Sequence, residues 1–570
     1  MTTLRSPGVQ SETEVVIVGA GPAGLATAIE LGRRGIRTVV VEQQREIAEG
    51  HPRAAQLQVR TMEFFRRWGI ATRLREHGLL APEFGPTVSF ATSMTGLNIA
   101  TVPFFASTGG PSGTISPEEG GWAPQFHFTR VMEEVARSLA SVEVLRGWRY
   151  TGLSEDRSSV TAEIAQVDGP LRRTITAHYL VAGDGGQGTV RRDAGIEYQG
   201  VPDLSHWLYI PFRAPDLAAT MTVDASVMYF VFTPDGTMVV RPISRERWDI
   251  QLAGFDPSTD VASLDVDAIA RAAIGPTEVG FTAGTPAVIA LHDLITDRYT
   301  SGRVVLAGDA AHLIVHYGGH NGNTGIADGV NLGWKLAALV RGWGGAGLLD
   351  SYEAERRPAA LRTRDTAMAS MQESGRAMFD AIGGGIPTGD SPADRDALRA
   401  IQEKLAAHAD LTWQANGVTL DQRYSDSPVV VADDVTVPEW DPRVLAEVAA
   451  AGHRAPHVFE PPNGSVHDAF GPEFTLLRLD AAGDDGGALV RAAADRGVPL
   501  TVLDRAGEPY RAAYQAALTL IRPDGHIAWR ADSSPQDPAA VVDLVRGAGG
   551  SSLGRSDSRG RAAPETAVSH

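Results

Sequence analysis

The feature that most constrains this chain is a glycine turn close to its beginning. Residues 14–18, EVVIV, have the length and β-branching of a short buried strand, and GAGPAGL follows from Gly19. A helix-period run, ATAIELGRRG, comes next, and the strand RTVVVE ends at Glu42. A G-x-G-x-x-G turn between a strand and a helix, followed by a second strand that ends in an acid, is typical of a dinucleotide-binding βαβ unit. The sequence therefore predicts a Rossmann-like domain here.

Each position of this turn has its own predicted role. Gly19 permits the tight turn, Gly21 lets the backbone approach a pyrophosphate, and Gly24 lets the helix pack closely on the strand. The helix N-terminus offers N–H groups and a partial positive charge to the phosphates. Glu42 would accept hydrogen bonds from a ribose diol and would disfavour a 2′-phosphate, so the expected nucleotide is FAD or NAD and not NADP. The candidate contacts in this unit are Gly19, Gly21, Pro22, Ala23, Gly24, Glu42 and Gln43.

Composition removes several classes of function. The net charge of −18 over 570 residues argues against a nucleic-acid surface. The chain has no cysteine, which excludes disulfides, thiolate metal sites and cysteine nucleophiles, and we assign no metal site. No apolar run approaches the roughly 20 residues of a membrane span, and residues 1–10 lack the apolar core of a signal peptide. We therefore expect a cytoplasmic protein without a nucleic-acid or membrane partner.

Two later segments repeat one pattern, a strand that runs into Gly-Asp. HYLVAGDGGQGTVRRDAGI, residues 178–196, contains Asp184, and RVVLAGDAAH, residues 303–312, contains Asp309. Each segment alone is equally well explained by an Asx turn. Their order after the glycine turn favours two more nucleotide contacts. The glycine-rich stretch that begins at Gly318 cannot bury a core of its own and looks like backbone arranged around a planar polar ligand.

Together these segments carry a resemblance to a known family. GAGPAGL, the VAGDG segment and LAGDAAH with the following GGHNGNTGIADGVNLGWKL resemble the three signatures of the class A flavin-dependent monooxygenases, the p-hydroxybenzoate and phenol hydroxylase family. HPRAAQLQVRTMEFFRRWGI, residues 51–70, and SYEAERRP, residues 351–358, resemble two further family segments. The resemblance covers roughly residues 12–430. It is nearest to the actinobacterial aromatic polyketide hydroxylases, and RPDGHIAWR resembles their thioredoxin-like C-terminal domain.

The resemblance implies how FAD would be held. Asp309 should hydrogen-bond the ribityl chain, and the loop from Gly318 should pass beside the flavin pyrimidine edge, with backbone N–H groups near N1 and O2. A helix from about Ile326 should point its positive end at that edge, with Asp328 as an ordinary first-turn acid. Where the family commonly has a ribityl-contacting glutamine, this chain has Thr129 followed by Arg130. The remaining implied contacts are Arg53, which the family associates with flavin movement, Asp184, Gly319, Gly322 and Asn323.

The same loop departs from the family pattern at two positions. His316 stands where the family has a proline, and Asn321 stands where it has a glycine. We name His316, Tyr317, His320 and Asn321 as candidate active-site residues, against the alternative that they are polar loop residues bonded to backbone. A histidine here would tune substrate ionisation near neutral pH.

Between residues 199 and 300 the pattern becomes that of an antiparallel sheet. ASVMYFVFTPDGTMVVRPIS predicts two strands around a turn, and RWDIQLAGF predicts a third. The family places its aromatic substrate between such a sheet and the flavin. Strand alternation lets at most half of the candidate wall residues face a pocket. These candidates are Tyr229, Phe230, Phe232, Arg241 and Trp248. Residues 100–122, rich in Gly, Pro and Ser, are either a gating loop or a surface excursion.

The predicted fold class is α/β: a Rossmann-like FAD-binding domain, an inserted antiparallel-sheet substrate domain and a C-terminal thioredoxin-like domain. The C-terminal strands are expected in GHRAPHVF, FTLLRLD, PLTVLD and LTLIRPDGHIAWRAD. Without cysteine this domain cannot perform thiol redox chemistry, so a stabilising or assembly role is expected. The expected division is 12–198 and 301–430 for FAD binding, 199–300 for substrate, 431–548 for the C-terminal domain and 549–570 for a disordered tail.

The resemblance implies an FAD-dependent monooxygenase of secondary metabolism. It would use NADPH or NADH with O₂ to hydroxylate an electron-rich phenolic or polyketide substrate through a flavin C4a-hydroperoxide, and it is a possible homodimer. Two alternatives stay open at this point. One is Baeyer–Villiger oxygen insertion on the same scaffold, and the other is a non-catalytic flavin-binding subunit.

Overall fold

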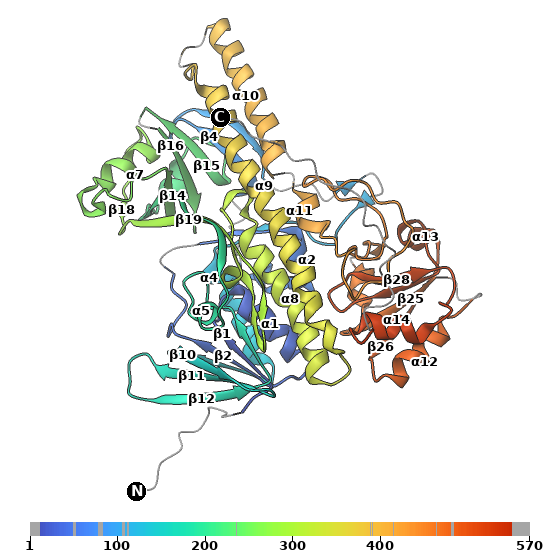
Figure 1. Ribbon diagram of the computed structural model, residues 1–570. Coiled ribbons are helices and arrows are strands. Elements are labelled where there is room, and N and C mark those ends of the chain that lie inside the picture. Colours follow the sequence, from blue (N-terminus) through green and yellow to red (C-terminus); the bar gives the residue numbers. More distant parts are fainter. Residues whose placement is uncertain are drawn as a thin grey trace, which may run out of the picture.

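The computed structural model of the chain has three parts, which are separate in Figure 1. A Rossmann-like part lies at the lower left, a second sheet lies above it, and the C-terminal domain lies at the right. The predicted tail, apart from Gly549, lies outside the described residues. The structure describes residues 12–49, 53–77, 84–104, 109–110, 113–234, 236–387, 389, 391–413, 415–462, 464–479 and 484–549.

The first sheet is the predicted nucleotide-binding sheet. Its six strands are ordered β20-β21-β13-β1-β2-β9, and all neighbours are parallel except β20. Strands β1, β2 and β21 are short, mainly apolar runs that are buried on both faces, as is typical of parallel sheets. Their bounds are β1 Val15–Val18, β2 Thr38–Glu42, β9 Val142–Arg146, β13 Tyr179–Ala182, β20 Thr300–Ser301 and β21 Val304–Leu306. The three-stranded antiparallel sheet β10 (Trp148–Glu155), β11 (Val160–Gln166) and β12 (Arg172–Ala177) connects β9 to β13.

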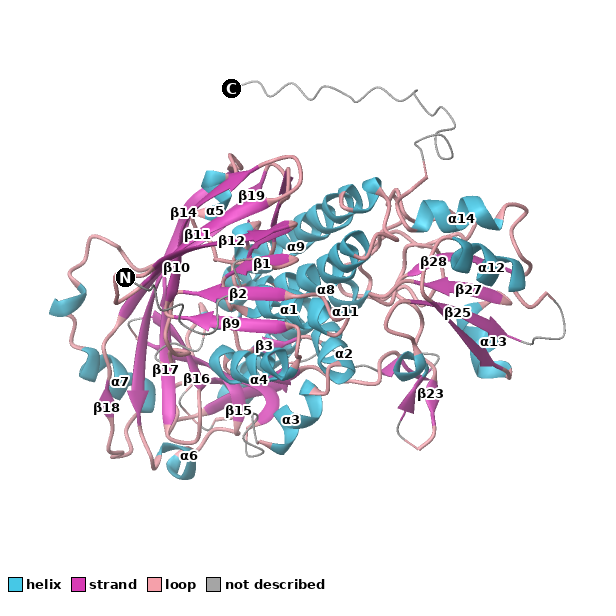
Figure 2. Ribbon diagram, turned by 90° about the horizontal axis from the view of Figure 1, so that it is seen from below, coloured by secondary structure: helices cyan, strands magenta, loops and turns pink. Residues whose placement is uncertain are grey.

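Two helices packed on this sheet approach each other through glycines. Helix α1 (Pro22–Gly32) lies against α8 (Asn321–Val340) beside the sheet (Figure 2). A Cβ added at Gly329 would lie 2.7 Å from the Ala23 carbonyl oxygen, and one at Gly333 would lie 2.4 Å from Glu30 Cβ. The glycines of DGVNLGW therefore let the two helices touch along their length, and α8 begins at Asn321, earlier than expected.

The second sheet contains the predicted antiparallel strands, but it draws on more of the chain than residues 199–300, and its strands at residues 226–233 and 85–91 are parallel to each other. Its order is β22-β19-β14-β17-β16-β15-β4-β5, with β18 paired to β14. Strands β4 and β5 come from the segment expected to bind FAD, and Phe90 of β4 stacks on Phe230 of β15 at 5.3 Å. Burial of Phe90 on this aromatic face holds β4 in the sheet, and β5 joins it by pairing with β4. The bounds are β4 Gly85–Ala91, β5 Asn98–Pro103, β14 Tyr198–Arg213, β15 Ser226–Thr233, β16 Gly236–Pro242, β17 Arg247–Ala253, β18 Thr282–Ala283, β19 Ala287–Thr296 and β22 His312–Leu313.

A helical hairpin leads from the Rossmann-like part to the C-terminal domain. Helices α9 (Asp350–Ile382) and α10 (Pro392–Trp413) pack on each other and project at the top of Figure 1. No described helix is long and apolar enough to cross a membrane. The remaining helices include α2 Val59–Arg67, α3 Ile70–Glu76, α4 Gln125–Ser138, α5 Val190–Asp193, α7 Val266–Ile274 and α11 Asn416–Leu420.

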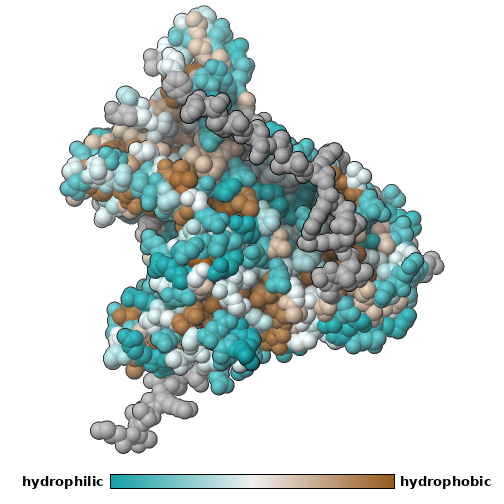
Figure 3. All heavy atoms as spheres, viewed as in Figure 1, coloured by the Kyte–Doolittle hydropathy of each residue, from teal (hydrophilic) through white to brown (hydrophobic). Residues whose placement is uncertain are grey.

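The C-terminal domain is a four-stranded mixed sheet, ordered β26-β25-β27-β28, with α12, α13 and α14. Three of the four predicted strand segments are confirmed, but GHRAPHVF is wrong as a strand. Only Phe459 enters a strand, and Arg454 turns inward to form a buried ion pair with Glu63. Hydrophilic residues cover most of this domain on the face seen in Figure 3. The bounds are β25 Phe474–Leu479, β26 Leu500–Arg505, β27 Leu518–Ile521, β28 Ile527–Ala531, α12 Gly487–Asp495, α13 Glu508–Tyr514 and α14 Pro538–Val545.

Candidate active site

A single cavity joins the carboxyl ends of the parallel strands to the inner face of the second sheet. Its volume is about 1890 Å³. Pockets for one small ligand have volumes of about 300–1,000 Å³, so this cavity has room for a dinucleotide and a second ligand. In open α/β sheets such crevices at the carboxyl strand ends are where ligands bind. The cavity thus runs from a nucleotide end, at the glycine turn, to an aromatic end, at the second sheet.

The glycine turn forms the floor of the nucleotide end. Gly19 has a φ of 103°, and a Cβ there would lie 2.2 Å from the Gly183 carbonyl oxygen. A Cβ at Gly24 would lie 2.1 Å from the Gly19 carbonyl oxygen, so Gly24 faces the strand and does not line the cavity. Gly21 differs from both, because a Cβ there would meet only the Gly183 oxygen, at 4.0 Å. The backbone at Gly21 is therefore open toward the cavity.

Glu42, at the end of β2, is held by the backbone around it. Its Oε2 accepts a hydrogen bond from Ala20 N at 2.9 Å, and its Oε1 accepts one from Gln44 N at 2.8 Å. Each carboxylate oxygen can still accept another donor. Glu42 and Gln43 both line the cavity, which places a fixed carboxylate where a ribose diol would be bound.

Two buried oxygens beside the glycine turn have no hydrogen-bond partner among the described residues. They are Thr129 Oγ1, on α4, and Asp184 Oδ1, after β13, and both residues line the cavity. Asp184 Oδ2 accepts from Val190 N at 3.1 Å, and burial raises the pKa of this carboxyl group. Buried polar atoms are nearly always satisfied, so these oxygens indicate a missing polar ligand. Arg130 is a correction: it lies outside this cavity, half-exposed and paired with Glu49.

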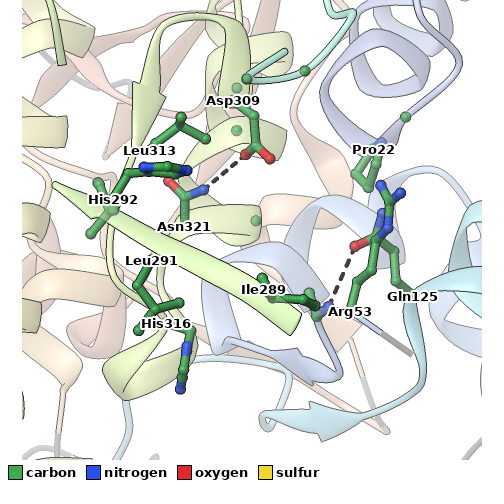
Figure 4. A pocket seen from close by; sticks show the side chains of 18 of the residues that line it. Pro22, Arg53, Gln125, Ile289, Leu291, His292, Asp309, Leu313, His316 and Asn321 are labelled. Carbon is green, nitrogen blue, oxygen red and sulfur yellow. Dashed lines mark hydrogen bonds between the residues drawn. The ribbon is translucent and has the colours of Figure 1, made fainter. Parts of the chain in front are cut away.

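Across the cavity, Asp309 and Asn321 are joined, and Figure 4 shows the pair opposite Arg53. Asn321 Nδ2 donates to Asp309 Oδ1 at 2.8 Å. The Asp309 carboxyl group opens onto the cavity, and burial raises its pKa. Arg53 lines the opposite wall with a φ of 51°, a left-handed conformation that costs energy in any residue except glycine and concentrates at functional sites.

Behind Asn321 lies a buried relay that the sequence did not reveal. His312 Nδ1 bonds to Asn321 Oδ1 at 2.8 Å, and its Nε2 bonds to Asp328 Oδ2 at 2.8 Å. Asp328 Oδ1 also accepts from Arg356 Nε at 2.7 Å. Burial is the largest single influence and would lower the pKa of His312, but the charge and hydrogen bond of Asp328, together with Asn321 and Asp309, outweigh it and raise that pKa. The expectation that Asp328 is a first-turn acid is wrong, because α8 begins at Asn321 and Asp328 is a fully buried ion-pair partner of Arg356.

The loop before α8 contains two glycines in the left-handed conformation, and the N-terminal end of α8 that follows it faces the cavity. Gly318 and Gly319 have φ values of 74° and 65°. Gly319, Asn321 and Gly322 line the cavity. The first N–H groups of a helix have no partner within it and carry its partial positive charge. The start of α8 therefore presents a positive end to the cavity.

Of the two histidines in this loop, only His316 lines the cavity. Its ring stacks on Tyr317, with centroids 5.4 Å apart, and it makes no hydrogen bond to a described residue. Burial, with a further contribution from Arg241, lowers the pKa of His316 to about 3. The ring is therefore neutral near pH 7, and its predicted effect on the ionisation of a substrate stays a prediction. Tyr317 also lines the cavity, and burial raises its pKa.

His320 is a correction to the predicted site, whereas the predicted contact of the Asn323 backbone N–H with the flavin stays a prediction. His320 is buried away from the cavity, where its Nδ1 contacts the Gln58 side chain, and burial lowers its pKa to about 4. The Asn323 side chain binds backbone: Nδ2 donates to Gln56 O at 3.0 Å, and Oδ1 accepts from Gln58 N at 3.0 Å. Both side chains fix the loop from behind, because the left-handed glycines turn them inward.

The aromatic end is walled by the second sheet and by the helical hairpin. Phe230 and Arg241 line the cavity as expected, and the other three candidates do not. Strand alternation turns Tyr229 and Trp248 into the core, whereas Phe232 shares the face of Phe230 and packs on Phe90 outside the cavity. Arg241 forms a buried ion pair with Asp249 at 2.6 Å. The expected gating loop lies partly outside the described residues, although its flanks reach the wall. Wall residues missed from the sequence are Phe104, Trp122, Trp207, Tyr209, Met228, Met378 and Trp413. The alternation of Trp207 and Tyr209 in β14 is the signal that could have found two of them.

These residues fit FAD. The open backbone at Gly21, the fixed carboxylate of Glu42 and the unpartnered oxygens of Thr129 and Asp184 gather at the nucleotide end. The Asp309–Asn321 pair and the positive start of α8 lie where the flavin part would follow.

Comparisons with known proteins agree with an FAD-binding site in this cavity. The family described as FAD binding domain matches residues 12–367, and the family described as aromatic-ring hydroxylase, C-terminal, matches residues 448–550. The chain belongs to the FAD-dependent aromatic-ring hydroxylases. Among curated members of this family, aklavinone 12-hydroxylase RdmE of Streptomyces purpurascens is 30% identical over 94% of this chain and 98% of its own. The 4-methyl-5-nitrocatechol 5-monooxygenase of a Burkholderia species is 30% identical over 94% of this chain and 97% of its own.

Solved structures of the FAD-dependent hydroxylases show the same architecture. The rebeccamycin biosynthetic enzyme RebC with reduced flavin superposes with a TM-score of 0.82, at 30% identity, covering 95% of this chain and 100% of that one. The flavin-dependent monooxygenase PieE, in complex with FAD and substrate, superposes with a TM-score of 0.83, at 27% identity, covering 95% and 99%. The predicted fold class, with its three parts, is confirmed.

Proposed function

We propose that this chain is a single-component FAD-dependent monooxygenase that hydroxylates an electron-rich phenolic or polyketide ring. The overall reaction consumes one NADPH or NADH, one O₂ and one proton, and it yields a ring hydroxyl, the oxidised nicotinamide and one water. Bound FAD would supply the redox chemistry, taking a hydride from the nicotinamide and delivering one oxygen atom to the ring. The chain's own residues bind, orient and shield the reactants.

One observation carries this proposal: the nucleotide end and the aromatic end belong to the same cavity. A dinucleotide at the glycine turn and an aromatic ring against the second sheet would meet between Asn321 and His316. A walled cavity of this kind excludes water, which protects reactive oxygen species from wasteful decay. A binding subunit without catalysis would not need the two sites to be joined.

At the flavin position, the chain offers groups that favour negative charge. The start of α8 directs its partial positive charge into the cavity, and a reduced flavin is negatively charged near N1. Asp309, held by Asn321, would bind the ribityl chain. We propose Arg53 as a further contact at the opposite wall.

At the substrate position, His316 would accept the hydrogen bond of a phenolic hydroxyl group. Its imidazole is neutral, lines the cavity and has no hydrogen-bond partner among the described residues. A hydrogen bond to a neutral base makes the ring oxygen, and so the ring, richer in electrons. Tyr317 and Phe230 would enclose the ring from its faces.

The residues that line the aromatic end favour a large substrate. Its wall carries aromatic side chains from β14, β15 and α10 and methionines from β15 and α9, all on one cavity. A polycyclic aromatic polyketide, of the class that aklavinone hydroxylases act on, fits such a wall better than a single phenol ring does. We propose a homodimer and a cytoplasmic location as well, and both stay predictions.

The test is a product analysis under ¹⁸O₂ with the purified holoenzyme and NADPH. Hydroxyquinones and polycyclic phenols are the substrates to compare. The expected product contains one ¹⁸O atom, and NMR places it in a ring hydroxyl group. A ring-expanded lactone would show Baeyer–Villiger insertion instead. NADPH consumption without any oxygenated product, across the whole panel, would contradict the proposal.

A further inference from the structure

The loop between β27 and β28 of the C-terminal domain, residues 522–526 (RPDGH), is buried against the helices of the flavin site. Both guanidinium ends of Arg522 donate to the carboxylate of Glu355 on α9, at 2.7 Å each. Asp524 Oδ2 accepts from Asn331 Nδ2 at 3.1 Å and from Trp334 Nε1 at 3.3 Å, both on α8. Arg522 and Asp524 are 2% exposed. The loop therefore hydrogen-bonds to the C-terminal half of α8 and to the start of α9.

The contacts continue along α9 to the other half of α8. Arg356, which follows Glu355, donates to Asp328 and to the Thr324 carbonyl oxygen, at 2.7 and 3.2 Å. Its Nη1 donates to the Tyr424 hydroxyl group at 2.8 Å, and the Tyr424 ring packs on His526 of the loop with centroids 4.2 Å apart. Asp328 then reaches the cavity through His312 and Asn321. A continuous chain of contacts thus leads from the loop to Asp309.

The donors and acceptors of the last hydrogen bonds, from Asp328 to Asp309, can be assigned. The carboxylate of Asp328 can only accept a hydrogen bond from His312 Nε2, so that nitrogen carries a proton. With Nδ1 also protonated, His312 donates to Asn321 Oδ1, and the amide nitrogen of Asn321 is left to face Asp309. If Asp328 lost its position, nothing among these contacts would hold the Asn321 amide in that orientation.

We propose that the RPDGH loop of the C-terminal domain is a positioning element of the flavin site, which fixes α8 and α9 so that Asn321 presents its amide donor to Asp309. This inference rests on the proposed FAD site. It gives the C-terminal domain a part in cofactor binding that requires no cysteine. The loop acts through other residues and touches neither flavin nor substrate.

The cluster is balanced in charge, and this decides which substitutions are informative. Three ion pairs link this cluster: Lys335 with Glu355, Glu355 with Arg522, and Arg522 with Asp524. Removing one charge leaves the buried cluster with a net charge. Asp524→Asn keeps the size of the side chain. Tyr424→Phe is milder, because it removes one hydrogen bond to Arg356 and keeps the ring on His526. The second variant keeps the test decisive if the first folds poorly.

A matched control exists at the same domain interface. Glu473, also in the C-terminal domain, pairs with Arg34 of the Rossmann-like part at 3.2 Å and forms no hydrogen bond or ion pair with the described residues of α8 or α9. Glu473→Gln removes the same charge from the same domain. If the C-terminal domain contributes only stability, Glu473→Gln and Asp524→Asn should both lower the thermal midpoint, and neither should change the affinity for FAD.

The experiment measures FAD dissociation constants by flavin fluorescence, together with the visible circular dichroism of bound flavin. Asp524→Asn and Tyr424→Phe should each raise the dissociation constant at least about fivefold, the factor carried by one hydrogen bond of ordinary net strength, and change the dichroism. Glu473→Gln should change neither. In an Asn321→Ala background, Asp524→Asn should have less than about a twofold further effect, because both changes act on the same contact.

The inference is overturned if Asp524→Asn and Tyr424→Phe leave the FAD dissociation constant and the dichroism unchanged. It is also overturned if Asp524→Asn raises the dissociation constant by the same factor in the Asn321→Ala background as in the unaltered protein. Either result would leave the proposed FAD site intact. Failure of the unaltered protein to bind FAD would instead refute the proposed function, and the inference with it.

Discussion

Two glycines of the same turn should respond in opposite ways to one added methyl group. Gly24→Ala places a Cβ 2.1 Å from the Gly19 carbonyl oxygen, well inside the 3.0 Å below which real Cβ atoms essentially never approach another heavy atom. Helix α1 must then move away from β1, and overpacking of this kind costs about 1–3 kcal/mol. Each kcal/mol lowers the thermal midpoint by roughly 2–4 °C in a domain of 150–250 residues. The apo protein should therefore melt earlier by about 2–12 °C.

Gly21→Ala should instead leave the apo protein intact and damage cofactor binding. Gly21 has a φ of −77°, which any residue adopts, and its Cβ would have open space, with only the Gly183 oxygen at 4.0 Å. A glycine-to-alanine change at such a site stabilises by about 0.4–1 kcal/mol through the unfolded chain. The methyl group would, however, occupy the approach of the pyrophosphate, and we expect the FAD dissociation constant to rise by about tenfold or more.

The assay is differential scanning fluorimetry of the apo proteins, followed by FAD titration of both variants. The account fails if Gly21→Ala binds FAD normally. It also fails if Gly21→Ala destabilises the apo protein as much as Gly24→Ala does, because the structure assigns ligand contact to one position and helix packing to the other.

Three further predictions concern the loop and its surroundings. His316→Phe keeps the ring shape but removes both nitrogens, so FAD affinity should be unchanged while product formed per NADPH consumed, with the best phenolic substrate, falls about tenfold. The pKa of His320 is lowered to about 4, so the folded state binds fewer protons than the unfolded state. The contribution of neutral His320 to folding stability is fully present above about pH 6.5 and is lost as the pH falls to 4, at a cost of roughly 3 kcal/mol. His320→Gln should show a smaller acid-induced fall in thermal midpoint, and an unchanged fall would contradict this. Arg130→Ala should leave FAD affinity within about twofold, because Arg130 is half-exposed, pairs with Glu49 and lies off the cavity; a large loss would show that this surface reaches the cofactor.

The elements that sequence alone predicted are those with local causes. The strands around the glycine turn follow from short apolar runs, and the roles of Gly19 and Gly24 follow from turn and packing geometry that is set within a few residues. The hairpin of β15 and β16 follows from alternation and a Pro-Asp-Gly turn.

What sequence did not predict depends on contacts between distant segments. The relay through His312 and Asp328 needs the true start of α8 and the position of Arg356 on another helix. The inward turn of His320 depends on Gln58, which is far away in the chain. Strand β4 belongs to the substrate sheet because Phe90 packs on Phe230 of β15, and β5 follows by pairing with β4; no periodicity specifies such a partner.

The most direct test of the central claim, that flavin and aromatic substrate share one cavity, is anaerobic stopped-flow reduction of the holoenzyme by NADPH. It is run with no addition and then with phenols, hydroxyquinones and polycyclic polyketides. The account predicts that one class of aromatic compound changes the rate of flavin bleaching by about tenfold or more, because that compound lies against the site where hydride arrives. The same rate with every compound, under conditions where the compounds are shown to bind, would contradict the shared cavity.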